Sequence, residues 1–171
     1  ASVLEPVYRS SADSVRLANV LEVLIGHEED PLRKVELLHQ VAEIYEVHVE
    51  DAQRAFAAYA RAFPIDPQNQ SSLTALDRLA EKIRAWPQLT GLYDEATTRL
   101  RADSPEVTVD LALRAAQVFE LRLGDVEQAI RRYGIVAEIE PEHLQTLEAL
   151  ERLYEGTQRW AELWQVLSRK V

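Results

Sequence analysis

Apolar residues recur along this chain with the three-to-four-residue spacing of an amphipathic helix, and no strictly alternating run exceeds a few residues. Ala55, Tyr59 and Ala62 illustrate the pattern, because they fall at positions i, i+4 and i+7 and therefore share one helical face. The same spacing returns 34 residues later at Leu89 and Tyr93. The hydrophobic pattern predicts an all-α protein without a β-sheet.

Proline and capping residues divide this pattern into separate helices. Asp30-Pro31 and Ser104-Pro105 each place a side-chain oxygen before a proline at the first helical position, which is a typical helix start. We expect ten helices, near 2–9, 13–27, 31–48, 51–64, 68–84, 86–101, 105–122, 125–138, 142–157 and 159–170.

The sequence also repeats itself. A shift of 74 residues aligns 31–97 with 105–171 without a gap, and 18 of the 67 aligned positions are identical. A partial third copy precedes them, because Val20-Leu21 aligns with Val166-Leu167. The identical pairs include Ala42/Ala116, Glu46/Glu120, Asp51/Asp125, Ala55/Ala129, Tyr59/Tyr133, Arg78/Arg152 and Trp86/Trp160.

Short connections and an internal repeat together favour antiparallel helix hairpins that stack on one another and bury a continuous core. We expect one repeat domain over 1–171, a right-handed α-solenoid of about five hairpins, near 2–27, 31–64, 68–101, 105–138 and 142–170. The recurring alanines of each copy then allow neighbouring helices to approach closely, and the recurring tyrosines fill the space one turn away.

These residues resemble the tetratricopeptide repeat superfamily, whose motif is carried best by the second helices. That motif has a small residue, an aromatic residue four positions later, another small residue and then a proline, as at Ala55, Tyr59, Ala62 and Pro67. The first helix over 31–48 fits only if one extra residue is allowed before Asp51.

The resemblance implies a non-enzymatic scaffold that binds a peptide or a helix in the concave groove formed by the first helices. We expect no clamp for acidic C-terminal tails. Family members with such a clamp have Lys and Asn on their first helices, and the corresponding positions of this chain hold other residues. The groove is largely acidic, which favours a basic or mixed-charge peptide, although glutamate is also simply a soluble helix former. The implied groove residues are Glu36, His39, Glu43, Glu46, Ser71, Thr74, Arg78, Glu81, Asp110, Leu113, Gln117, Glu120, Gln145, Glu148, Arg152 and Glu155.

Composition narrows the function classes further. The 171 residues carry a formal net charge of −10, which argues against nucleic-acid binding because phosphate binding needs clustered Lys and Arg. The absence of cysteine excludes disulfides and thiolate metal sites but leaves the cellular compartment open. The longest unbroken apolar run, 55–60, is far too short to span a membrane.

Catalytic and metal-binding patterns are weak. His39 and Glu43 lie one helical turn apart, but there is no HExxH pattern, no glycine-rich phosphate loop and no nucleophile elbow. We therefore expect no enzymatic activity, no metal and no cofactor.

Three tryptophans bear on packing and on the end of the chain. Trp86 and Trp160 occupy the same repeat position, so we expect both to pack in the core rather than to form a binding surface. The last helix has more apolar residues than one buried stripe needs, and we expect an apolar patch there that includes Trp164 and Val166. That patch predicts that the natural protein continues past residue 171 and that the segment associates end to end with a second copy or a foreign helix. A peptide-binding scaffold and a structural or self-assembling spacer therefore both remain open.

Overall fold

A computed structural model describes the backbone of residues 5–169 and the side chains of 13–169. Within that part of the chain all regular structure is helical, which confirms the predicted all-α class. The chain divides into two compact units, Ala1–Ala85 and Trp86–Val171. The predicted single domain over 1–171 stays a prediction.

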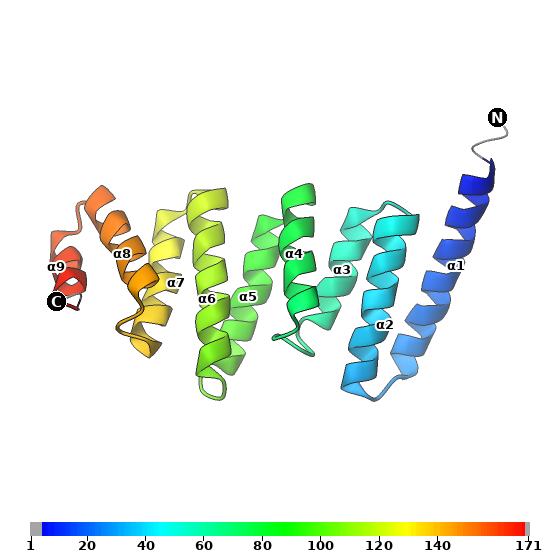
Figure 1. Cartoon of the computed structure of the whole chain (residues 1–171), viewed down its shortest axis with the longest axis horizontal. Helices are drawn as coiled ribbons and strands as arrows, with labels where there is room; N and C mark the ends of the chain where they lie inside the picture. Colours follow the sequence, from blue (N-terminus) through cyan, green and yellow to red (C-terminus); the bar gives the residue numbers. More distant parts are fainter. Residues whose placement is uncertain (1–4, 170–171) are drawn as a thin grey trace. The chain divides into compact units, whose positions relative to one another are not determined.

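The first unit contains four helices: α1 Glu5–His27, α2 Pro31–Glu43, α3 Ala52–Ala62 and α4 Gln70–Ile83 (Figure 1). Each helix packs against the next one in the sequence. The side chains of Asp30, Asp51 and Asn69 accept hydrogen bonds from backbone N–H groups at 2.9–3.0 Å and cap α2, α3 and α4.

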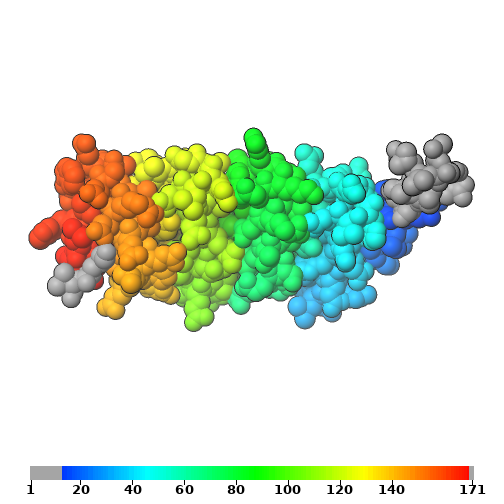
Figure 2. Space-filling model, turned by 45° about the horizontal axis from the view of Figure 1, so that its top comes forward, coloured from blue at the N-terminus to red at the C-terminus, as the bar shows by residue number. Residues whose placement is uncertain are grey.

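The second unit contains α5 Trp86–Leu100, α6 Pro105–Val118, α7 Val126–Ile139, α8 Leu144–Gly156 and α9 Trp160–Arg169. Successive helices again pack together. Asp125 caps α7 through a bond of 3.0 Å from the Gln128 N–H, whereas Ser104, expected to cap α6, makes no side-chain cap bond. Inside each unit, side chains fill the spaces between neighbouring helices (Figure 2).

The first predicted hairpin is wrong, because residues 5–27 form one continuous helix instead of a pair. No glycine or proline interrupts residues 7–25, so the two serines at 10 and 11 do not end the helix. Pro6 is the second residue of α1, where the missing N–H costs no helical hydrogen bond. The predicted start at residue 2 lies outside the described residues.

The extra residue that the repeat motif required before Asp51 is absorbed in a π-helical turn, Ile44–His48, which prolongs α2. A second π turn, Phe119–Leu123, prolongs α6 one repeat later, with its start shifted by one residue. Each turn ends with a backbone hydrogen bond between residues six positions apart. Asp51 N donates to Tyr45 O at 2.8 Å, and Asp125 N donates to Phe119 O at 2.9 Å. Helices α4 and α8 have no extra residue, and each ends with the usual backbone hydrogen bond between residues five positions apart.

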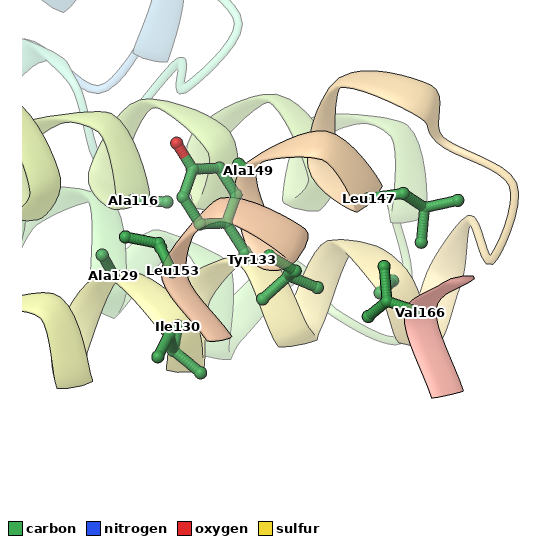
Figure 3. Packing of buried hydrophobic residues seen from close by; sticks show 10 residues of the cluster. Ala116, Ala129, Ile130, Tyr133, Leu147, Ala149, Leu153 and Val166 are labelled. Carbon is green, nitrogen blue, oxygen red and sulfur yellow. The ribbon is translucent and has the colours of Figure 1, made fainter. Parts of the chain in front are cut away.

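The recurring alanines and Tyr133 lie in the core, as the repeat predicted, whereas Tyr59, the counterpart of Tyr133 in the first unit, is only partly buried. Ala42, Ala55, Ala116 and Ala129 are all fully buried. In the second unit they surround Tyr133, which is 3% exposed and lies among side chains from α6, α7 and α8 (Figure 3).

The prediction for Trp160 is wrong. Its repeat equivalent Trp86 is partly buried, with the Arg122 guanidinium 5.3 Å from the ring centroid, but Trp160 is 61% exposed. The given sequence has no position 74 residues after Arg122, and among the described residues no guanidinium lies over the Trp160 ring. Val166, expected on the outside, is buried in the α7–α8 core cluster instead.

Candidate functional site

In the first unit, a cavity of about 400 Å³ lies between α3 and α4. It belongs to the face formed by the first helices of the hairpins, α2 and α4, which we call the first-helix face. Tyr59 of α3 lies on one side, and the other side consists of successive turns of α4. Helical spacing brings the α4 residues together, because positions 70, 71, 74, 75 and 78 follow one stripe of the helix. The α4 lining residues are Gln70, Ser71, Thr74, Ala75 and Arg78.

His39 of α2 supports the side of the cavity that Tyr59 forms. Its ring centroid lies 5.2 Å from that of Tyr59 at an angle of 56°, and its Nε2 is hydrogen-bonded to Ser72 Oγ at 2.7 Å. Burial lowers the pKa of His39, against a smaller raising effect of Asp66, and the imidazole is therefore neutral at neutral pH. This arrangement fixes the Tyr59 ring through neutral contacts.

Arg78 is held by Glu46, which lies inside the π-helical turn at the end of α2. The two side chains form a bidentate ion pair, one bond of which, from Nη2 to Oε2, is 2.9 Å long. The hydrogen bond from Arg78 lowers the pKa of Glu46, so this carboxylate stays ionised. The pair leaves the cavity close to neutral, with Glu43 as the nearby exposed acid.

The repeat-equivalent place in the second unit is arranged differently. Tyr133 donates a hydrogen bond of 2.9 Å to Glu120 Oε2, and Arg152 donates one of 2.5 Å to Glu120 Oε1. Leu113 stands where the first unit has His39, and Leu144 stands where it has Gln70. In the first unit, by contrast, both carboxylate oxygens of Glu46 accept hydrogen bonds from Arg78. Among the described residues, none forms a hydrogen bond with the Tyr59 hydroxyl.

The structure therefore brings together some of the predicted groove residues and separates others. His39, Glu46, Thr74 and Arg78 lie around the first-unit cavity, and Glu120 pairs with Arg152 in the second unit. Glu36 is exposed and paired with Arg33 at 2.5 Å, and Asp110 is paired with Arg114 at 3.0 Å. The remaining ones lie on the first helices without a shared cavity; Glu43, Glu81, Gln145, Glu148 and Glu155 are exposed, and Leu113 and Gln117 are partly exposed.

Sequence reasoning missed Tyr59 and Gln70 as lining residues. Tyr59 matched Tyr133 in the repeat and was therefore assigned to the core. The useful signal was in the differences between the two copies, at the pairs His39/Leu113 and Gln70/Leu144.

The described residues contain no group of three or more His, Asp or Glu side chains placed to hold a metal ion. None of their helices is long and apolar enough to cross a membrane.

No protein-family model matches the sequence, and no curated protein matches it. Among solved structures, the crystal structure of MamA superposes with a TM-score of 0.52 at 14% identity, over 94% of this chain and 88% of that one. A second structure, "MamA RS-1 ArsTM double mutant", gives 0.51 at 14% identity, over 99% of this chain and 93% of that one. MamA is a TPR-like helical protein. At such low identity the likeness concerns the fold alone, and it supports a TPR-like fold of the all-α solenoid class for this chain.

Proposed function

We propose that this chain is a non-enzymatic protein-interaction scaffold that binds a peptide or a helix on its first-helix face, at the first-unit cavity. The observation that carries the proposal is the difference between the two repeat copies. In the second copy Tyr133 is hydrogen-bonded to Glu120, whereas in the first copy Tyr59 lines a cavity together with Gln70, Ser71 and Thr74.

The cavity chemistry favours a hydrogen-bonding ligand. Tyr59, Ser71 and Thr74 supply hydroxyl groups that can both donate and accept, and Gln70 can also do both. The Arg78 charge is already neutralised by Glu46, so a free anion gains little there. A basic or mixed-charge peptide remains the proposed class, because the surrounding exposed acids include Glu43 and the chain is net acidic.

The test is a random peptide display library panned against the whole chain, with affinities of the enriched peptides measured by fluorescence anisotropy. The blocking variant is Gln70→Leu/Thr74→Glu, which installs the residues that occupy the equivalent positions in the second unit and therefore suits the fold. We expect the blocking variant to weaken the enriched peptides about tenfold or more, which corresponds to about 1.4 kcal/mol.

Leu144→Gln/Glu148→Thr, the reciprocal change in the second unit, is the matched control and should leave these affinities unchanged. Enriched peptides that bind the wild type and both variants equally would place the site elsewhere. Enrichment of acidic peptides alone would contradict the proposed ligand charge.

A second candidate function is a self-assembling segment of a longer repeat protein. It is favoured by a separate observation, the exposed apolar surface of the last helix, where Trp160 and Trp164 are 61% and 73% exposed. This surface belongs to α9 and shares no residue with the first-unit cavity.

A further inference from the structure

The exposed apolar face of α9 is defined by Trp160, Trp164 and Leu167, which fall at i, i+4 and i+7. At about 100° per residue these three side chains lie on one stripe, and the charged residues of the helix, Glu162 and Arg169, lie on the opposite side. The α9 face is therefore a continuous apolar surface without a charge of its own.

Repeat-equivalent faces elsewhere in the chain are covered by a neighbouring helix. In α5, which packs against α6, the equivalent residues are Trp86, Thr90 and Tyr93, and Thr90 and Tyr93 are 3% and 0% exposed. In α1 the equivalents of Trp164 and Leu167 are Ala18 and Leu21, which are buried where α1 packs against α2. This face is thus a packing face wherever its partner is present.

Trp164 changes what kind of partner fits. The covered faces have small residues at this position, Thr90 in α5 and Ala18 in α1, so that the next helix can approach to about 8–10 Å. An indole at the same place prevents that approach. The partner must instead offer a hollow between larger side chains.

Helix α1 offers such a hollow beside the stripe that packs against α2. Leu17, Val20 and Leu24 are 52%, 57% and 50% exposed and lie at i, i+3 and i+7, the arrangement that borders a hole on a helix surface. Since α1 already buries Ala18 and Ile25 against α2, it is apolar on two sides, which is typical of a helix that packs on both.

We propose that the α9 face of one copy binds the α1 face of a second copy, with Trp164 seated between Leu17, Val20 and Leu24. Arg16 borders the α1 face, and among the residues whose side chains the structure describes it is held only by an exposed contact of 3.6 Å with Asp13. It is placed to lie over Trp160 as Arg122 lies over Trp86 in the second unit. The inference rests on the second candidate function, self-association, and is independent of peptide binding at the cavity.

The contact is heterologous, so each association leaves one α1 face and one α9 face free, and assembly continues beyond a dimer. Its area sets a limit on its strength. The exposed parts of the two tryptophans amount to roughly 300 Å², because a fully buried aromatic side chain removes about 150–250 Å². With the smaller side chains added, the interface stays below about 1,200 Å², the range of weak and reversible complexes.

Sedimentation equilibrium of the whole chain over a wide concentration range tests the proposal. We expect reversible association that passes beyond a dimer in the wild type. Trp164→Glu, which blocks the α9 face, and Val20→Glu, which blocks the α1 face, should each weaken association more than about tenfold. Both positions are largely exposed, and circular dichroism checks that each variant is folded.

The decisive arm mixes the two variants in equal amounts. Each retains the face that the other lacks, so the mixture should form a one-to-one dimer that grows no further, whereas each variant alone stays monomeric. Leu144→Glu is the matched control, because it charges an equally exposed leucine outside both faces and should associate as the wild type does. The cavity variant Gln70→Leu/Thr74→Glu should also associate normally, which separates this result from the peptide test.

Three results would overturn the inference. The first is a wild type that stays monomeric at every concentration. The second is association that Trp164→Glu abolishes but Val20→Glu does not, because this pattern indicates a symmetric contact between two α9 faces. The third is a mixture of the two variants that fails to dimerise while the wild type associates.

Discussion

Tyr59 and Tyr133 occupy the same repeat position but make different contacts. The Tyr133 hydroxyl is hydrogen-bonded to Glu120, and both burial and this bond raise its pKa. Tyr59 lines the first-unit cavity, and its hydroxyl has no hydrogen-bond partner among the described residues. The two residues therefore allow one substitution to be compared in two settings within a single protein.

Removing the hydroxyl should destabilise the fold only in the second unit. Tyr133→Phe leaves Glu120 without one of its donors and should lower the free energy of unfolding by about 1 kcal/mol. Tyr59→Phe should change it by less than about 0.5 kcal/mol. Urea denaturation of both variants beside the wild type measures the difference, and equal losses would contradict the contrast drawn between the two copies.

His39 should make the stability of the fold depend on pH. Because burial lowers its folded-state pKa below the unfolded value near 6.5, the stabilisation is present above that pH and is lost as the pH falls. The double variant His39→Leu/Ser72→Ala removes both hydrogen-bonding partners and should lose less stability than the wild type between pH 7.5 and about 5.5.

Melting temperatures at the two pH values give the comparison. The exposed His48→Leu is the control and should retain the wild-type dependence. A double variant that loses as much stability on acidification as the wild type would show that His39 is not the responsible group.

At the scale of the element, helical period and proline positions were sufficient to predict most helices from the sequence, because each such signal acts locally. The prediction of a helix break near residue 10 was wrong because it also used only a local signal. Serines disfavour a helix only weakly, and the packing of α1 on α2 outweighs them. The prediction that Trp160 is buried was wrong because repeat position predicts burial only where the next helix is present. The cavity could not be predicted, since it depends on which of two equivalent tyrosines finds a carboxylate.

The π turns provide a prediction about helix ends. After the first π turn Glu50 has φ 58°, a left-handed conformation that costs a residue with a side chain about 1 kcal/mol or more. The repeat-equivalent residue after the second π turn is Gly124, at φ 67°. Glu50→Gly should therefore raise the free energy of unfolding by roughly 0.5–1 kcal/mol.

Chemical denaturation measures this gain. The matched control is Gly124→Ala, which places a side chain in the same conformation and should lower stability by a similar amount. A destabilising Glu50→Gly would mean that the Glu50 side chain makes a contribution larger than the backbone strain.

At the scale of the whole molecule, net charge opposes the association proposed for α1 and α9. Each copy carries −10, so two copies repel each other, while the faces that meet are apolar. Raising the salt concentration from about 50 to about 500 mM shortens the Debye length to a few ångströms and should strengthen association severalfold. Sedimentation at the two salt concentrations tests this, and weaker association in high salt would point to an interface held by ion pairs.

The positions of the indoles also determine what emission spectroscopy can observe. All three tryptophans, at 86, 160 and 164, lie in the second unit, so fluorescence excited selectively in indole reports on Trp86–Val171 alone. Far-UV circular dichroism reports on the helices of both units. If 1–171 is the single repeat domain that the sequence predicts, the two signals should change at one denaturant concentration. Separate midpoints would show that Ala1–Ala85 unfolds at a different denaturant concentration from Trp86–Val171. Indole fluorescence does not detect the unfolding of Ala1–Ala85, because that unit contains no tryptophan.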